Sequence, residues 1–180
     1  EGTADTALID IQLKRWVHMA QLGWYSGDTH VHRSLQDVRV AMLAEDLNLA
    51  FPLTYWVTAA HESPTNGAKS TDTPPGNQPV EIAPGYILYP LNTEYELFTY
   101  GGKRHTLGAV FVLGHQTPLE IPAPRVGPIA IEARKQNALL DLDKHTWPWS
   151  AMIVPIMKVD LFELANNHIW RTEFMFRDWT

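Results

Sequence analysis

The sequence predicts an α/β fold, and the order of its elements fits part of an α/β barrel better than a closed β-sandwich. The first observation is a strand–helix–strand unit, with its elements over residues 24–32, 37–49 and 50–57. Such a unit implies parallel strands with a right-handed crossover. The second observation is that a helix and two further strands follow later in the chain, over residues 128–137, 138–142 and 159–164.

The elements at the start of the chain follow from their apolar pattern. Residues 7–17 are rich in β-formers and partly alternate, which predicts a strand. This strand would belong to residues 1–22, which we interpret as a linker or the tail of an upstream β-segment, and the main domain would cover residues 23–180. In the first helix, apolar residues recur near helical spacing, and Ser34 or Asp37 can cap its first turn.

The middle of the chain is predicted to contain a hairpin and two long loops. Residues 86–100 and 104–113 are β-rich runs joined by Gly101-Gly102, which is a turn signal. Proline-rich segments over residues 63–84 and 118–128 predict loops. Loops of this length within a compact domain are usually functional or disordered.

Composition restricts the classes of function. With 180 residues, 45% of them hydrophobic, and seven tryptophans, the chain can bury a sizeable core. A net charge of −6 argues against a nucleic-acid partner, and no apolar run reaches the roughly 18 residues of a membrane span. Cysteine is absent, so any metal must be held by nitrogen and oxygen. Because no nucleophilic-serine motif or phosphate-binding glycine loop is present, metal-assisted hydrolysis is the remaining enzymatic interpretation.

A His-x-His pair, His30 and His32, ends the predicted strand over residues 24–32. Side chains alternate along a strand, so both imidazoles project from one face, with their Cα atoms roughly 6–7 Å apart. Two imidazoles in this arrangement can bind one divalent cation. Asp28 precedes the pair and Asp37 follows it, and both add carboxylates of the kind that metal sites use, although Asp37 serves equally well as a helix cap.

Residues further along the chain are candidate partners for this pair. Glu94 lies inside an apolar β-rich run, where it either faces a metal or lines the solvent side. His105 opens the return strand of the same hairpin, so it either lies near Glu94 or is a solvated turn residue. His145 follows a strand, at the position that carries the chemistry in α/β barrels. His61 follows the strand over residues 50–57 and is a further candidate.

The segment GDTHVHRSLQD resembles the first motif of the polymerase-and-histidinol-phosphatase (PHP) superfamily, which reads Asp-x-His-x-His and then Asp five residues later. The surrounding GWYSGDTHVHR and DVRVAMLAEDLNLA are similar to the CehA/McbA-type metallohydrolase branch. The resemblance implies a distorted (β/α)7 barrel that holds divalent metals at its strand ends and hydrolyses phosphoesters, carbamates or related esters. It also implies an extracytoplasmic location, either periplasmic or secreted.

The resemblance assigns metal-ligand roles to five residues, with a bridging role for the glutamate: His30, His32, Glu94, His105 and His145. Trp56 departs from the family pattern, because it stands where the second motif usually has a histidine. Either His61 substitutes for that histidine or one metal position is missing. The late Asp-x-His motif is absent, so the PHP-like domain over residues 23–180 is expected to be incomplete at its C-terminus.

We therefore expect a metal-dependent hydrolase that acts on a small-molecule substrate through metal-activated water. It would hold one to three Zn, Mn or Fe ions, with Asp37 and His61 as catalytic candidates. A rival interpretation is a metal-free module of the same fold that binds carbohydrate or a protein partner through a tryptophan-rich rim of Trp56, Trp147 and Trp149. A third is a single-metal esterase or lyase.

Overall fold

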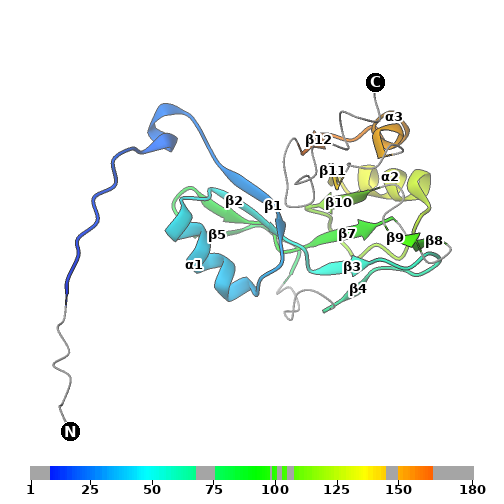
Figure 1. Ribbon diagram of the computed structural model, residues 1–180, viewed down its shortest axis with the longest axis horizontal. Coiled ribbons are helices and arrows are strands. Elements are labelled where there is room, and N and C mark those ends of the chain that lie inside the picture. Colours follow the sequence, from blue (N-terminus) through cyan, green and yellow to red (C-terminus); the bar gives the residue numbers. More distant parts are fainter. Residues whose placement is uncertain are drawn as a thin grey trace, which may run out of the picture.

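The computed structural model describes residues 9–67, 76–97, 99–100, 103–104, 108–144 and 150–163. Within these residues the strands form a four-stranded sheet, a six-stranded sheet and a two-stranded ribbon, accompanied by three α-helices (Figure 1). The predicted α/β class is therefore confirmed. The described strands do not close into a barrel.

The four-stranded sheet contains the predicted strand–helix–strand unit. Its order is β1-β2-β6-β5, and these strands are Gly27–Val31, Leu49–Pro52, Tyr86–Leu88 and Val80–Ala83. Strands β1 and β2 are parallel, and helix α1 (Leu35–Glu45) connects them and packs on the sheet through Val38 and Met42. Ser34 is the cap of α1, because its Oγ accepts the N–H of Asp37 at 3.1 Å. The hydroxyl thus satisfies an amide that the first helical turn leaves without a partner.

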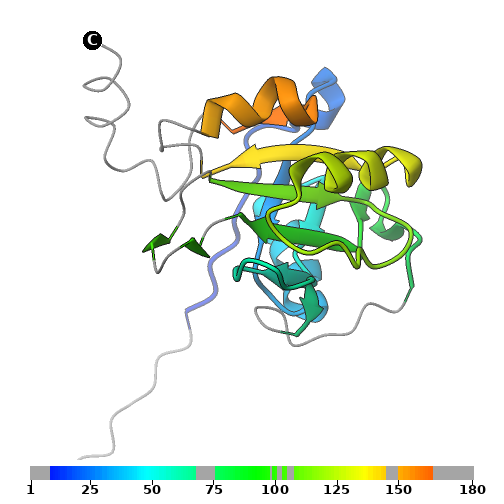
Figure 2. The same cartoon turned by 90° about the vertical axis from the view of Figure 1, so that its right-hand side faces the viewer.

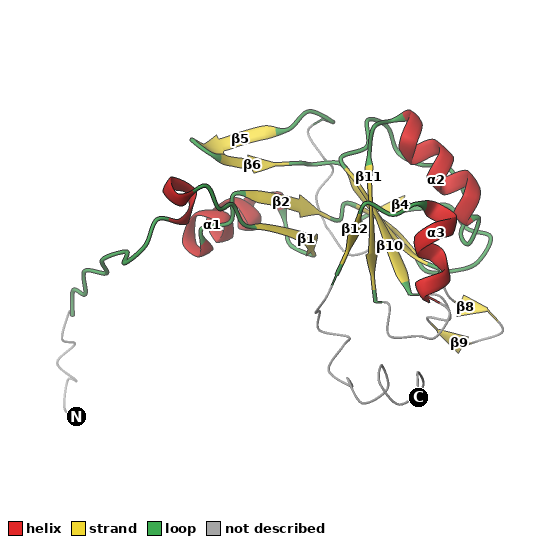
Figure 3. Cartoon of the chain, turned by 90° about the horizontal axis from the view of Figure 1, so that it is seen from above, coloured by secondary structure: helices red, strands yellow, loops and turns green. Residues whose placement is uncertain are grey.

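The six-stranded sheet has the order β12-β11-β10-β7-β3-β4. These strands are Leu161–Phe162, Leu139–Asp143, Ala109–Leu113, Asn92–Glu96, Tyr55–Val57 and Thr65–Asn66. The central strands β11, β10 and β7 are antiparallel neighbours, and Figure 2 shows β10 and β11 side by side. Helices α2 (Val126–Lys135) and α3 (Ile153–Met157) cover the face turned away from the four-stranded sheet (Figure 3).

The remaining elements are short. Strands β8 (Thr99–Tyr100) and β9 (Lys103–Arg104) pair antiparallel, as do β7 and β10, which confirms the hairpin predicted around Gly101-Gly102. The β-rich run predicted over residues 86–100 is not one strand, because it is divided among β6, β7 and β8, and β6 belongs to the four-stranded sheet. Two 3-10 helices, η1 (Met19–Leu22) and η2 (Ser150–Met152), precede β1 and α3.

Side-chain alternation gives the two faces of the six-stranded sheet different chemistry. On the helix-covered face, Leu140 and Leu142 of β11 and Tyr95 of β7 belong to the largest apolar core. The opposite face carries Phe111 of β10, and on the neighbouring strands it carries four buried carboxylates, Glu94, Glu96, Asp141 and Asp143. Burying a charged group costs free energy unless the group is paired. The function of this face therefore depends on the groups that contact these four carboxylates.

The prediction of a strand over residues 7–17 is wrong for residues 9–17, the part of this segment that the structure describes. Residues 9–17 form no strand and follow an extended path away from the sheets (Figure 1). Their apolar side chains are exposed, with Leu13 at 92% and Trp16 at 94%. A pattern rich in β-forming residues indicates side chains that fit against a packed sheet. Within the described residues, no strand pairs with this segment.

Two other predicted boundaries also change. Residues 50–57, which were predicted to form one buried strand, contain two strands, β2 and β3, and these belong to different sheets. Between them Thr54 is buried, and its Oγ donates to the carbonyl of Pro90 at 3.1 Å, so the chain crosses from one sheet to the other without leaving the interior. The loop predicted over residues 63–84 contains β4 and β5 near its two ends, and residues 68–75 lie outside the described part.

Candidate metal centre

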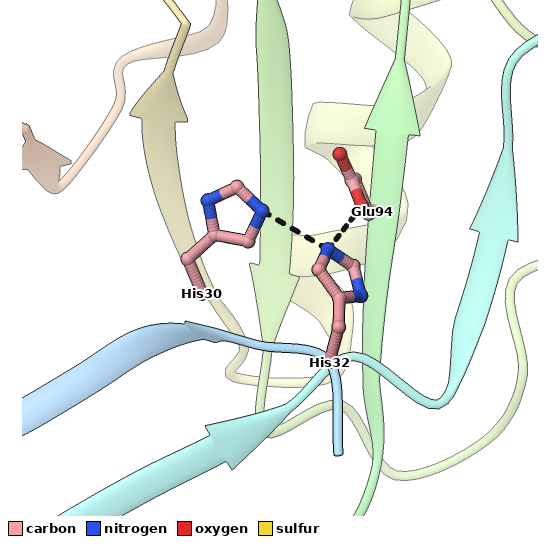
Figure 4. Close-up of side chains that lie close together, drawn as sticks. All are labelled: His30, His32 and Glu94. Atoms are coloured by element: carbon pink, nitrogen blue, oxygen red, sulfur yellow. Dashed lines mark hydrogen bonds and ion pairs between the residues drawn. The ribbon is translucent and has the colours of Figure 1, made fainter. Parts of the chain in front are cut away.

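His30 and His32 come together as the strand pattern predicts. His30 belongs to β1 and His32 follows its last residue, so both side chains leave the same face of the strand. Their Nε2 atoms are 3.0 Å apart, and the two rings meet edge to face (Figure 4). The Oδ1 atom of Asp28 accepts the backbone N–H of His30 at 2.9 Å and fixes the end of the strand. Both imidazoles stay partly exposed, at 17% for His30 and 28% for His32.

Glu94 supplies the third ligand-type atom. It lies on β7, its side chain is fully buried, and its Oε2 atom is 3.2 Å from Nε2 of His32 (Figure 4). One ligand atom from each of His30, His32 and Glu94 can be chosen so that all lie within 4.8 Å of one another. Ligands at 2.0–2.1 Å from a tetrahedral zinc ion are separated by about 3.3 Å. The spacing of the three residues therefore fits one divalent ion.

Asp143 holds the other nitrogen of His30. The Nδ1 atom of His30 is 3.2 Å from Oδ2 of Asp143, whose side chain is fully buried at the end of β11. Burial raises the pKa of Asp143, but the hydrogen bonds from His30 and Glu163 lower it by more, so the net pKa lies below its ordinary value. An ionised carboxylate on Nδ1–H leaves the lone pair of Nε2 pointing at the ligand cluster, as metal-binding histidines usually require.

Phe111 packs against the ring of His30. The two rings lie 4.8 Å apart, centroid to centroid, at an angle of 65°. Phe111 is fully buried on β10, between β7 and β11, so it separates Glu94 from the acidic residues of β11. The ring of Phe111 therefore packs directly against one of the two histidines of the site.

Glu163 forms a second acidic contact at the edge of the site. It follows β12, and its Oε1 accepts the hydroxyl of Thr29 at 3.0 Å. Burial and the hydrogen bond to Asp143, together with the charge of that carboxylate, raise the pKa of Glu163 to about 8. Glu163 thus keeps its proton to a higher pH than an ordinary glutamate, beside an aspartate whose pKa is lowered. His30, Asp143 and Glu163 also lie close enough to form a second group of ligand-type atoms.

Lys144 is a buried cation on this face. Its Nζ atom lies 2.5 Å from Oε1 of Glu94 and 2.5 Å from Oε1 of Glu96, and its side chain is 2% exposed. Burial lowers the pKa of Lys144, but the two carboxylates raise it by more, so the net pKa lies above the ordinary value. The ammonium is therefore charged and compensates the carboxylates.

Sequence reasoning did not single out Asp143, Lys144 or Glu163. A signal for Asp143 was present, because acidic residues alternate with leucines in LLDLD of β11. Strict alternation of acidic and apolar residues indicates a strand with one polar face. Lys144 gave no such signal, since lysine is almost never fully buried.

The other predicted site residues lie elsewhere. His105 and His145 are outside the described residues, as are Trp147 and Trp149. Asp37 is exposed in the first turn of α1, and His61 is exposed after β3, where its N–H donates to the carbonyl of Ala123 at 2.7 Å. Neither joins the groups of ligand-type atoms found among the described residues, so their catalytic roles stay predictions. Trp56 is half-buried on β3, in register with Glu94.

Comparison with known proteins finds no matching family model, no matching curated protein and no matching solved structure. The described helices include none that is long and apolar enough to cross a lipid bilayer.

Proposed function

We propose that this chain is a metal-dependent hydrolase domain whose divalent ion is bound by His30, His32 and Glu94. One observation carries the proposal: the Nε2 atoms of the two histidines are 3.0 Å apart, and Oε2 of Glu94 is 3.2 Å from Nε2 of His32. The proposed fold is a PHP-type barrel, and the proposed substrates are phosphoesters, carbamates or related esters, as the motif implies.

The contacts of His32 favour an ion over a hydrogen-bonded cluster. Its Nε2 atom faces both Nε2 of His30 and Oε2 of Glu94. A single proton on this nitrogen can be directed well at only one of these two atoms, whereas a cation between the three residues interacts with all of them. Neutral imidazole and carboxylate are ligands that zinc and similar ions accept.

The charges and exposure of the site suit hydrolysis. A divalent ion held there would lower the pKa of a bound water to about 7 and polarise a carbonyl or phosphoryl oxygen. The partly exposed edges of His30 and His32 leave the ligand cluster open to solvent and substrate. Asp143 contacts Nδ1 of His30, and Glu163 lies beside Asp143 with a pKa above its ordinary value in the metal-free chain. The chain itself thus supplies an acidic partner for His30 and a second carboxyl group next to the centre.

Metal analysis tests this proposal. The chain would be stripped with a chelator, dialysed separately against Zn²⁺, Mn²⁺ and Fe²⁺, and its metal content measured by mass spectrometry. We expect about one tightly bound equivalent of the preferred metal, lost in His32→Ala and in Glu94→Gln. His18→Ala is the matched control, because His18 is exposed and lies before η1. Hydrolysis of a panel of chromogenic esters should follow the metal content.

Two results contradict the proposal. One is a wild-type chain that retains less than half an equivalent of every metal. The other is a His32→Ala variant that keeps both the ion and the hydrolytic activity of the wild type.

A further inference from the structure

Lys144 occupies the side of Glu94 that faces away from the histidines. Oε2 of Glu94 contacts His32, while Oε1 lies 2.5 Å from the ammonium of Lys144. The same ammonium lies 2.5 Å from Oε1 of Glu96. Each oxygen of the Glu94 carboxylate is therefore assigned to a different cation position, one for the metal and one for lysine.

The backbone is shaped to bring Lys144 into this position. In a regular strand Lys144 would point to the face opposite Asp143. Instead its φ is 50°, a left-handed conformation that is uncommon for a residue with a side chain. Gly108 accommodates this turn, because a Cβ at position 108 would lie 2.7 Å from the carbonyl oxygen of Lys144. Strained backbone of this kind is maintained only where surrounding structure holds it, and it is common at functional sites.

The contact distances exclude a second metal ion at Oε1 of Glu94. A ligated divalent ion would lie about 2.0–2.2 Å from this oxygen. The Nζ atom of Lys144 already lies 2.5 Å from the same oxygen, so an ion at that position would overlap the ammonium. The two positive charges would also repel each other strongly in this buried environment.

Among the described residues, the other group of ligand-type atoms does not provide a second site. His30, Asp143 and Glu163 could surround an ion only if Nδ1 of His30 gave up its proton while Nε2 served the first ion. A neutral imidazole has one ring proton, and in this structure the carboxylate of Asp143 faces the nitrogen that would carry it.

On the basis of the proposed function, we infer that Lys144 takes the place of a second metal ion, so that the centre binds one divalent cation. Glu94 then binds the ion through one oxygen and does not bridge two ions. The ammonium supplies the positive charge that keeps the buried carboxylates of Glu94 and Glu96 compensated. Lys144 acts as a positioning residue, since it reaches the ion only through Glu94.

Counting ions in Lys144 variants tests this inference. Native mass spectrometry of the zinc-loaded chain should give one ion for the wild type and one for Lys144→Arg, which keeps the charge. Lys144→Met should give two ions, because removal of the ammonium opens its position beside the two Oε1 atoms to a second cation. Lys135→Met is the matched control: its side chain is 68% exposed and pairs only with Glu132 among the described residues. It should give one ion.

A melting measurement covers the case in which Lys144→Met folds poorly. In a chelator, the variant lacks the ammonium that both buried carboxylates contact in the wild type, so its melting temperature should fall below that of the wild type. Added zinc should raise this temperature by more in Lys144→Met than in the wild type, because two ions bind instead of one.

The outcomes separate this inference from the proposed function. Two ions on the wild type, or one ion on a folded Lys144→Met variant, overturn the role of Lys144 and leave the metal centre intact. If zinc stabilises Lys144→Met no more than the wild type, the inference is again wrong. A wild-type chain that binds no ion refutes the proposed function, and the inference is refuted with it.

Discussion

Asp143→Asn tests how the protein orients His30. In the native chain the buried carboxylate of Asp143 lies 3.2 Å from Nδ1 of His30. Asparagine keeps the shape and an acceptor oxygen but removes the negative charge, so Nε2 of His30 becomes a poorer donor to the ion. Removing such a partner of a metal-binding histidine typically weakens metal affinity 10–100-fold, or about 1.4–2.7 kcal/mol. Because the side chain of Asp143 is fully buried, water cannot compensate for the lost charge. We therefore expect a loss of zinc affinity in the upper part of this range.

The assay is competition for zinc against a chelator of known affinity, followed for the wild type, Asp143→Asn and Asp141→Asn. Asp141 is the matched control, because it is a buried aspartate two residues earlier on the same face of β11 and lies outside both ligand groups. Its replacement should change zinc affinity by less than a few-fold. If Asp143→Asn binds zinc within twofold of the wild type, the orienting role of Asp143 is refuted.

Two further predictions concern the surroundings of the centre. The pKa of Glu163 is raised from 4.5 to about 8, so the folded metal-free chain keeps a proton that the unfolded chain loses. The free energy of unfolding should therefore fall as pH rises from 4.5 to 8 and level off above it, and Glu163→Gln should flatten this dependence in denaturant titrations. Gly108→Ala should destabilise the chain by more than about 1 kcal/mol, because position 108 has a φ of 89° and a Cβ there would meet the carbonyl of Lys144. Gly76→Ala, where a Cβ meets nothing within 4 Å, should change the unfolding midpoint little.

The parts of the fold that the sequence predicted depend on local pattern. Alternation along β1 placed His30 and His32 on one face, and periodicity with a cap at Ser34 located helix α1. Glu94 was singled out as a carboxylate inside an apolar β-rich run, although the sequence left open whether it faces a metal or the solvent. These features are encoded within a few residues of each other, so they can be identified without knowing the tertiary structure.

The parts that sequence reasoning missed depend on contacts between distant segments. Residues 9–17 have a strand pattern but no strand beside them within the described chain. Residues 50–57 read as one strand, yet the chain passes from one sheet to the other at Thr54. Lys144 reaches Glu94 across 50 residues of sequence and from a left-handed backbone, and neither property leaves a local pattern.

The most direct test of the central claim is a crystal structure of the zinc-loaded chain with diffraction recorded at the zinc absorption edge. The account predicts an anomalous peak about 2.0–2.2 Å from Nε2 of His30, Nε2 of His32 and Oε2 of Glu94. It also predicts no second peak between Glu94 and Glu96, where Lys144 lies. A zinc-loaded crystal with no peak among these three ligand atoms would contradict the account.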